Sequence, residues 1–312
     1  MLLAGSLSRT LVTLWSALLI ISAPAGTAWA SPAVNVAEPE PAAAEAVVSP
    51  AHKDLLAGEQ LFPFEEIKNG NGDEQGEKPG SGPEDCIVDS KGEQVPRIAI
   101  IIDDMGYHQR IGNDLLDLDL NLTYSFLPHG PFTAELAERA RQQGHDILVH
   151  MPMEARDPVW NPGPGTLYLA DPLAIRTRNA EKDLSLVPYA VGVNNHMGSR
   201  FTEDREAMHQ FLDLLKQRNL FFIDSVTSSQ SVGMETARAM GIKTAHRHVF
   251  LDNIKTQEDI CHQLKLLVHK AAKLGWAIGI GHPNEATLTA LTRCRAMLRD
   301  QVRIVNIREL VR

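Results

Sequence analysis

The sequence predicts an α/β fold, a barrel of about seven parallel strands in which most strands are followed by a helix. Short apolar runs, several of them rich in isoleucine and valine, alternate along residues 95–312 with longer amphipathic stretches. This alternation is typical of strands buried on both faces and joined by helical crossovers. Periodicity does not separate a closed barrel from an open doubly wound sheet, but no glycine-rich nucleotide-binding motif follows the first strand. We therefore favour the barrel.

The candidate strands are short apolar runs that end in polar or turn residues. In chain order they cover residues 97–102, 122–127, 146–150, 190–194, 220–223, 243–251, 276–281 and 303–307, of which 243–251 and 303–307 are the weakest.

Helical periodicity is clearest in two stretches between these runs. Residues 203–218 and 260–271 carry apolar side chains at i, i+4, i+7 and i+8, so each stretch predicts an amphipathic helix that packs on the sheet. Thr202 is a candidate N-cap for the first of them. Gly241 and Gly275 are candidate C-caps, because glycine readily adopts the left-handed conformation that ends a helix.

The N-terminal part of the chain differs from this pattern. Residues 1–30 are typical of a secretory signal peptide, with a basic residue, an apolar stretch and an Ala-Trp-Ala cleavage site. The apolar stretch over 11–21 is shorter than the ~20 residues that span a bilayer, which favours cleavage over a retained membrane anchor. Residues 31–94, rich in Pro, Ala, Glu and Gly, predict a disordered tether. Residues 95–312 then form one catalytic-type domain.

The composition excludes one class of partner and one source of stability. The formal net charge of −9 at pH 7 argues against binding to nucleic acid or another polyanion. The 3 cysteines are too few for a disulfide framework. Cys261 and Cys294 both lie in helical patterns, where we expect each to be buried singly.

Chemically active side chains recur where the candidate strands end, and the active site of a barrel assembles from such carboxyl ends. Each residue alone has a structural explanation, such as a helix N-cap or a buried histidine, but core packing does not require the joint pattern. The residues are Asp103 and Asp104 after the first strand, His150 and Glu154 after the third, Asn194, Asn195 and His196 after the fourth, Asp224 and Ser225 after the fifth, and His282 after the seventh.

One carboxylate and two imidazoles with an open fourth position make a hydrolytic zinc site. We assign these ligands to Asp104, His150 and His196. Asp103 then acts as the general base or orients it, and His282 protonates the leaving group. The expected cofactor is a divalent metal. Zinc is the first choice, because it lowers the pKa of a bound water from ~9 to ~7, although iron, manganese or cobalt suit the same ligands.

Five segments, taken in order, carry a family resemblance. They are Ile-Asp-Asp-Met-Gly at 102–106, His-Met-Pro-Met-Glu at 150–154, Asn-Asn-His-Met-Gly-Ser at 194–199, Phe-Ile-Asp-Ser at 222–225 and Gly-Ile-Gly-His-Pro at 279–283. Through them the chain resembles the divergent polysaccharide deacetylase family, a branch of the carbohydrate esterase 4 (NodB-like) superfamily of metal-dependent deacetylases. The resemblance spans residues 97–312 and implies a distorted (β/α) barrel, the NodB-like deacetylase fold. It also supports His282 as the acid.

The chain departs from the superfamily pattern at two points. Ordinary members use an Asp-Asp pair, whose first member is the base and whose second is a ligand, and a His-x-x-x-His pair that completes the metal site. The resemblance places His150 on the first histidine, but Glu154 stands at the second. Either Glu154 is a ligand or His196 takes the missing place, and we favour His196. The Arg-x-Pro-Tyr motif that supports the base is not visible, so Arg200 substitutes for it or that function is lost.

Further polar residues are candidates for the substrate cleft. Arg247 clusters with His246, His248 and Asp252 around the sixth strand, where a structural ion pair is an equal alternative to a role in the cleft. The long proline-rich loop over 160–167 is either a lip of the cleft or a surface loop. The residues that we assign to the cleft are Asn194, Asn195, Arg200, Asp224 and Arg247.

These observations predict an exported, metal-dependent hydrolase, periplasmic or otherwise secreted, that removes acetyl groups from a cell-envelope polysaccharide. The expected partner is a carbohydrate, peptidoglycan or another envelope glycan. Neither a nucleic acid partner nor a stable membrane span after signal cleavage is expected. The alternative is a catalytically inactive barrel that keeps the cleft and binds a glycan or a cell-wall protein. The glutamate at position 154 and the missing Arg-x-Pro-Tyr motif favour that alternative.

Overall fold

The computed structural model describes residues 95–312. The predicted signal peptide over 1–30 and the predicted tether over 31–94 lie outside the described residues. Within 95–312, no helix combines the length and the apolar character that crossing a membrane requires.

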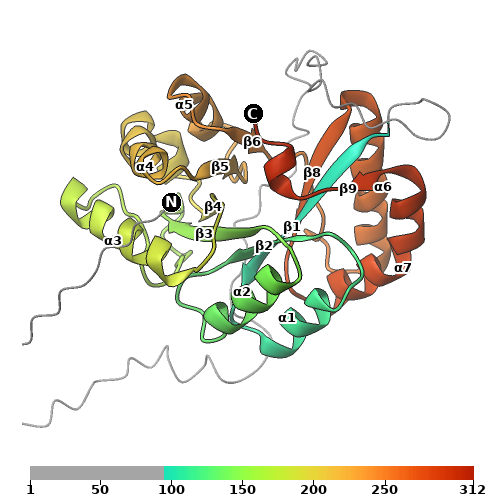
Figure 1. Ribbon diagram of the computed structural model, residues 1–312. Helices are drawn as coiled ribbons and strands as arrows, with labels where there is room; N and C mark the ends of the chain where they lie inside the picture. Colours follow the sequence, from blue (N-terminus) through green and yellow to red (C-terminus); the bar gives the residue numbers. More distant parts are fainter. Residues whose placement is uncertain (1–94) are drawn as a thin grey trace, which may run out of the picture. The chain divides into compact units, whose positions relative to one another are not determined.

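The described part of the chain contains one parallel sheet, which curls into a half-barrel (Figure 1). The strand order is β6-β5-β4-β3-β2-β1-β8-β7, and β9 pairs with the start of β1, where β2 does not reach. The strands are β1 (Arg97–Met105), β2 (Thr123–Phe126), β3 (Ile147–Met153), β4 (Gly192–Met197), β5 (Phe221–Asp224), β6 (Thr244–His246), β7 (Val249–Phe250), β8 (Trp276–Gly281) and β9 (Arg303–Ile304).

The two outer strands of this order, β6 and β7, are consecutive in the chain. Only Arg247 and His248 separate them, so the chain itself passes from one end of the strand order to the other. The strand predicted over 243–251 is therefore two strands, because its first residues pair with β5 and its last with β8. Arg312 exchanges backbone hydrogen bonds of 2.9 and 3.3 Å with Thr244, the first residue of β6.

Helices cover the outer face of the sheet (Figure 1). Three of them begin at a side-chain N-cap, Asp204, Thr256 or Asn284, that accepts a hydrogen bond from a backbone N–H of the first turn. The predicted N-cap Thr202 lies instead in a short 3₁₀ turn before Asp204, while Gly275 ends its helix at φ +84° as expected. The helices are α1 (Gln109–Leu116), α2 (Thr133–Gln142), α3 (Leu173–Leu186), α4 (Arg205–Gln217), α5 (Gly233–Ala239), α6 (Gln257–Leu274) and α7 (Glu285–Gln301), with 3₁₀ turns η3 (Phe201–Glu203) and η4 (Ile307–Glu309).

Two apolar layers stabilise the sheet, one on each face. Ile98, Ile100 and Ile102 of β1 belong to the larger layer, which packs against the helices. Ala99 and Ile101 belong to the smaller layer, which fills the barrel interior together with apolar residues of the segment around η4. Burial on both faces explains why the run in β1 is uninterrupted. Since the interior is packed, functional groups are restricted to the carboxyl ends of the strands.

A disulfide between Cys261 and Cys294 joins α6 to α7. The expectation that these cysteines are buried singly was wrong, because the two helices lie side by side (Figure 1) and bring the two Cα atoms to 6.4 Å, within the range that a disulfide spans. The sequence periodicity predicts each helix separately, but it does not predict that the two helices pack against each other. Cys86 lies outside the described residues.

Candidate metal centre

The carboxylate pair lies at an irregular point of β1. Asp104 has a left-handed φ of +54°, and the register with β2 shifts between Ile102 and Met105. In a regular strand, adjacent side chains point to opposite faces. Here both carboxylates face the same imidazole, with His150 Nε2 at 3.2 Å from Asp104 Oδ1 and 3.7 Å from Asp103 Oδ2. The irregularity therefore brings both acids to one site.

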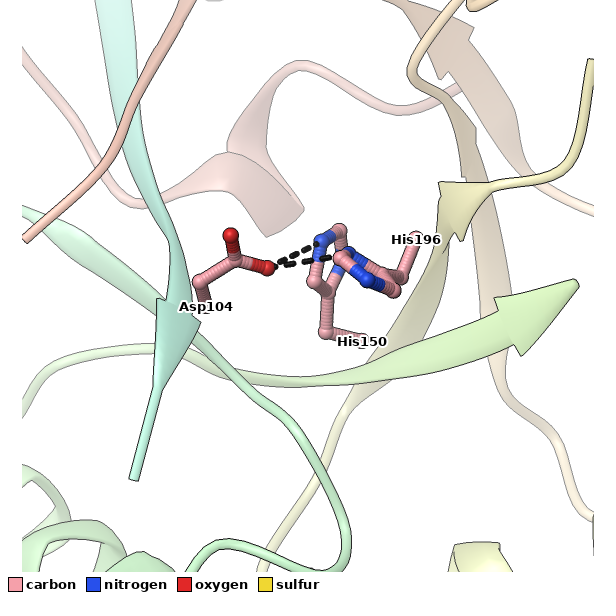
Figure 2. A group of neighbouring side chains, drawn as sticks. All are labelled: Asp104, His150 and His196. Atoms are coloured by element: carbon pink, nitrogen blue, oxygen red, sulfur yellow. Dashed lines mark ion pairs between the residues drawn. The ribbon is translucent and has the colours of Figure 1, made fainter. Parts of the chain in front are cut away.

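Asp104, His150 and His196 converge from β1, β3 and β4 (Figure 2). Asp104 Oδ1 lies 3.2 Å from His150 Nε2 and 2.9 Å from His196 Nδ1, and one ligand atom of each residue lies within 4.8 Å of the others. All three side chains are buried. Asp104 Oδ1 is a buried oxygen without a hydrogen bond of good geometry. One carboxylate oxygen and two imidazole nitrogens form a donor set that fits a divalent transition metal.

The electrostatics of Asp104 favour its ionised form. Burial opposes ionisation, but the charge of His196 and the close approach of the His150 and His196 imidazoles hold the pKa of Asp104 well below its usual value. A carboxylate that stays ionised when buried is able to bind a cation without first losing a proton.

Asn194 links the metal ligands to the second carboxylate. Its Oδ1 accepts hydrogen bonds from His150 Nδ1 at 2.8 Å and from Ser125 Oγ at 2.5 Å. Its Nδ2 donates to Asp103 Oδ1 at 2.8 Å and to Ser225 Oγ at 3.3 Å. The bond to Nδ1 fixes the tautomer of His150 and leaves Nε2 for a metal. Asn194, assigned to the cleft from sequence, therefore orients two residues of the site.

Asp103 has the environment of a proton acceptor. Burial raises its pKa above the ordinary value, although His150, His282 and the Asn194 hydrogen bond act in the opposite sense. Asp103 Oδ1 is held by Asn194, whereas Oδ2 faces His150. The second oxygen is thus the one directed toward the metal ligands.

His282, which follows β8, is paired with Asp252. His282 Nδ1 donates to Asp252 Oδ1 at 2.9 Å, and the His282 backbone N–H donates to Asp252 Oδ2 at 2.7 Å. Asn284 and Thr287 also donate to Oδ2, each at 2.9 Å. Burial disfavours the imidazolium, but Asp252 raises the pKa of His282 above its ordinary value. From sequence, Asp252 was assigned only to the cluster around the sixth strand. Like Asp103, it directly follows a predicted strand, and this position was the available signal that it supports a residue of the site.

Glu154 and Arg200 bind each other. Arg200 Nη1 lies 2.8 Å from Glu154 Oε1, and the backbone N–H of Leu169 donates to Oε2 at 2.7 Å. Both carboxylate oxygens of Glu154 are therefore engaged away from Asp104, His150 and His196. Arg200 is more than half exposed and is held by this carboxylate. Of the two alternatives for the third ligand, the geometry thus brings His196 and not Glu154 to the centre.

Arg247 contacts the loop that follows β5. Its guanidinium donates to the carbonyl oxygens of Ser225 at 2.7 Å and Val226 at 2.8 Å. Val226 has a φ of +49°, a conformation that β-branched residues avoid, so these bonds stabilise a strained turn. Burial lowers the pKa of Arg247 to about 10, while the charges of Asp224 and Asp103 act in the opposite sense. Arg247 therefore stabilises the loop after β5.

Asp224 and Asn195 are two further residues that were assigned to the cleft. Their side chains form hydrogen bonds with groups of the neighbouring loops. Asp224 accepts from the backbone N–H groups of Val226 and Met234 and from the Ser231 hydroxyl. Asn195 accepts from the backbone N–H of Ser225 and donates to a backbone carbonyl two residues on. These contacts shape the turns after β4 and β5.

The curled parallel sheet and the carboxylate and imidazole set at its carboxyl end define a (β/α) barrel with a candidate metal centre of the hydrolytic type. Residues 100–311 match the family described as divergent polysaccharide deacetylase. The chain therefore belongs to that family, which confirms the predicted resemblance, and the curled parallel sheet confirms the predicted (β/α) barrel.

Two sequence relatives and one solved structure share this domain. An uncharacterized protein of Haemophilus influenzae is 33% identical over 216 residues, which is 69% of this chain and 77% of the relative. The uncharacterized protein YibQ of Escherichia coli is 33% identical over 217 residues, 69% of this chain and 67% of the relative. The crystal structure of uncharacterized protein ATU2773 from Agrobacterium tumefaciens superposes with a TM-score of 0.67 at 26% identity, covering 72% of this chain and 98% of that chain.

Proposed function

We propose that this protein is an exported, metal-dependent hydrolase that removes acetyl groups from a cell-envelope glycan. One observation carries the proposal: Asp104, His150 and His196 converge at the carboxyl end of the sheet, with a second buried carboxylate, Asp103, beside them. A deacetylase needs such a metal site together with a proton acceptor and a proton donor. The family supplies the reaction class.

Asp104, His150 and His196 would hold the metal, and zinc is the metal that we expect. When bound, it would supply Lewis acidity that polarises an acyl carbonyl and acidifies a water molecule. Asn194 keeps His150 in the tautomer that presents Nε2, and holds Asp103 in place at the same time. The buried amide of Asn194 thus holds both a metal ligand and the base in position.

The two proton transfers fall to Asp103 and His282. Asp103 accepts the proton of the attacking water at Oδ2, because Oδ1 is bound to Asn194, and its raised pKa makes it a stronger base. His282 gives a proton from Nε2 to the departing amine or alcohol, because Nδ1 is bound to Asp252. Burial opposes the imidazolium, but Asp252 raises the pKa of His282, which favours the protonated form that this step needs.

Export is proposed from two features. Residues 1–30 have the composition of a secretory signal. The disulfide between Cys261 and Cys294 suits an oxidising compartment, since such bonds are rare in reducing cytosol. An envelope location makes peptidoglycan or another envelope glycan the expected substrate.

The proposal is tested by metal analysis of the purified protein followed by acetate release from chitooligosaccharides and peptidoglycan fragments. His196→Ala is expected to lose both bound metal and turnover, whereas Asp103→Asn is expected to keep the metal and lose turnover. His145→Ala is the matched control, because His145 is a partly enclosed histidine at the opposite end of β3. Full metal occupancy without acetate release from any substrate would instead support the glycan-binding alternative.

A further inference from the structure

Phe250 lies at the carboxyl end of β7 and points to the inner face of the sheet. Its neighbours Val249 and Leu251 belong to the larger apolar layer, which packs against the helices. Because side chains alternate along a strand, Phe250 faces the opposite way. Its ring is only half-buried, and it lies outside the five segments that carry the family resemblance. Phe250 is therefore an aromatic side chain of the inner face that the motifs do not account for.

The ring of Phe250 packs against the imidazole of His282. The two ring centroids are 5.2 Å apart, and the ring planes differ by 30°. The register of the sheet explains the contact. Phe250 pairs with Ile280 of β8, and His282 follows Ile280 by two residues, which brings its side chain to the face that carries Phe250. β7 and the two residues after it thus supply two contacts to the imidazole, the ring of Phe250 and the carboxylate of Asp252.

These two contacts restrain different features of the imidazole. Asp252 Oδ1 accepts from His282 Nδ1 at 2.9 Å, which fixes the tautomer and the position of that nitrogen. One hydrogen bond leaves the tilt of the ring to its packing, and the tilt decides where Nε2 points. The flat face of the Phe250 ring restricts this tilt, because aromatic rings pack in preferred relative orientations that an aliphatic side chain does not impose. Nε2 is the atom that gives the proton in the proposed reaction.

Arg247 in turn contacts Phe250. The guanidinium carbon lies 5.1 Å from the centroid of the Phe250 ring, the arrangement of a cation–π contact. The Arg247 backbone N–H donates to the carbonyl oxygen of Asp224 at 3.0 Å, and its guanidinium is bound to the carbonyl oxygens of Ser225 and Val226. Since β5 and β7 lie near opposite ends of the strand order, Arg247 joins the loop after β5 to β7. Phe250 is thus held by a side chain that is itself bound to the backbone.

We propose that Phe250 is a positioning residue for the proton transfer from His282, and that Arg247 fixes the Phe250 ring. The proposal rests on the proposed hydrolase function and deepens it, because it assigns the orientation of the acid to two side chains that no motif carries. The step concerned is the breaking of the bond between the acyl carbon and the leaving nitrogen or oxygen. The electron pair of that bond stays with the leaving atom, which takes the proton from Nε2.

The test compares two leaving groups in the zinc-loaded protein. The amine of a chitooligosaccharide leaves only after it gains a proton, whereas the acidic phenol of 4-methylumbelliferyl acetate leaves without one, so only the first reaction depends on a placed acid. Phe250→Leu should lower kcat for acetate release from chitooligosaccharides about 10- to 100-fold, the cost of a misplacement of about 1 Å, and kcat for the ester less than threefold. Zinc affinity should not change, because the metal ligands come from β1, β3 and β4.

Three further variants complete the comparison. Phe250→Tyr keeps the ring and should stay within threefold of the unmodified protein on both substrates. Arg247→Gln removes the cation from the ring and should separate the two substrates in the same direction as Phe250→Leu. His282→Gln removes the acid itself and should separate them at least as strongly.

Phe221→Leu is the matched control, because Phe221 belongs to the inner layer at the amino end of β5. It should lower stability without separating the two substrates. Equal losses on both substrates in Phe250→Leu would overturn the proposal and leave the ring a structural role only, as would an unchanged kcat for chitooligosaccharides. A failure of His282→Gln to separate the substrates would also overturn it, while zinc-dependent acetate release would retain the proposed function.

Proton NMR tests the contact without turnover. The ring-proton signals of His282, assigned by their loss in His282→Gln, should shift in Phe250→Leu, because the ring current of Phe250 is removed, and should stay in place in Phe221→Leu. If the unmodified protein released acetate from neither substrate, the hydrolase would be rejected together with the proton-transfer role. The shift in Phe250→Leu would then retain only the packing of the imidazole on the ring, and unchanged signals would reject that packing as well.

Discussion

Replacing Asn194 by leucine should weaken zinc binding about 10- to 100-fold, the usual effect of removing a partner that orients a metal-binding histidine. Asn194 is fully buried, and its Oδ1 accepts the Nδ1 proton of His150 at 2.8 Å. Leucine fills a similar volume but offers no acceptor, so the imidazole is free to change tautomer or to rotate. The expected loss corresponds to ~1.4–2.7 kcal/mol of binding free energy. Competition against a chromophoric chelator measures it.

The same substitution should destabilise the metal-free protein. It leaves the Nδ1–H of His150 and the Oδ1 of Asp103 without their hydrogen-bond partner in a buried site, and each such group costs ~1–3 kcal/mol. Urea unfolding in the presence of a chelator measures this loss. Asn195→Leu is the matched control: Asn195 is equally buried but bonds to the turns after β4 and β5, so its loss should lower stability without changing zinc affinity.

Asn194→Asp separates the two functions of this amide. An aspartate retains an acceptor for His150, so zinc affinity should stay within about tenfold of that of the unmodified protein. It also puts a carboxylate where the amide donated to Asp103 Oδ1 at 2.8 Å, and repulsion between the two acids should raise the pKa of one of them and impair turnover. The reasoning is refuted if Asn194→Leu and Asn195→Leu have the same effect on zinc affinity.

Four further outcomes are expected. Asp252→Asn removes the charge that raises the pKa of His282, so turnover should fall roughly tenfold or more and the alkaline limb of the pH–rate profile should shift to lower pH. Burial lowers the pKa of His248 to about 3 in the folded protein, below its unfolded value of ~6.5, so the folded state loses stability as the pH falls below ~6.5. Urea unfolding should show a loss of ~2 kcal/mol in unfolding free energy between pH 7.5 and pH 5. This loss should disappear in His248→Gln. Cys261→Ser breaks the disulfide and should reduce the unfolding free energy by about 2–4 kcal/mol. Zinc at 100 times its Kd should stabilise the native state by ~2.7 kcal/mol against thermal or urea unfolding, and His196→Ala should abolish this shift.

The strands were predictable because most are apolar runs bounded by polar residues. The predicted run 276–281 coincides with β8, and the predicted run 97–102 lies within β1. The region 243–251 was not resolved into β6 and β7, because its division depends on which distant strands lie at the two ends of the sheet order. Local periodicity carries no information about such long-range pairing.

The site was predictable in its position and less so in its contacts. Strand-end placement was enough to propose Asp104, His150 and His196 as a set, and the structure brings them together. The Arg200–Glu154 and His282–Asp252 pairs were not predictable, since each joins segments about 30 or more residues apart. The disulfide between α6 and α7 was missed for the same reason. Side-chain partners across the sequence depend on packing that a single pattern does not encode.

The glutamate at position 154 illustrates how a departure from a family pattern is accommodated. Because β3 and β4 pair in parallel with His150 opposite Asn194 and Pro152 opposite His196, the two polar residues of β4 lie on one face, two residues apart. One of them presents a nitrogen to Asp104, and the other orients His150. β4 therefore supplies both a ligand and the support for a ligand, which frees Glu154 to bind Arg200 and the backbone of Leu169. In the proposed metal centre the glutamate therefore corresponds to a relocated ligand and not to a lost site, and zinc binding by Glu154→Gln at unreduced affinity is the result that this relocation requires.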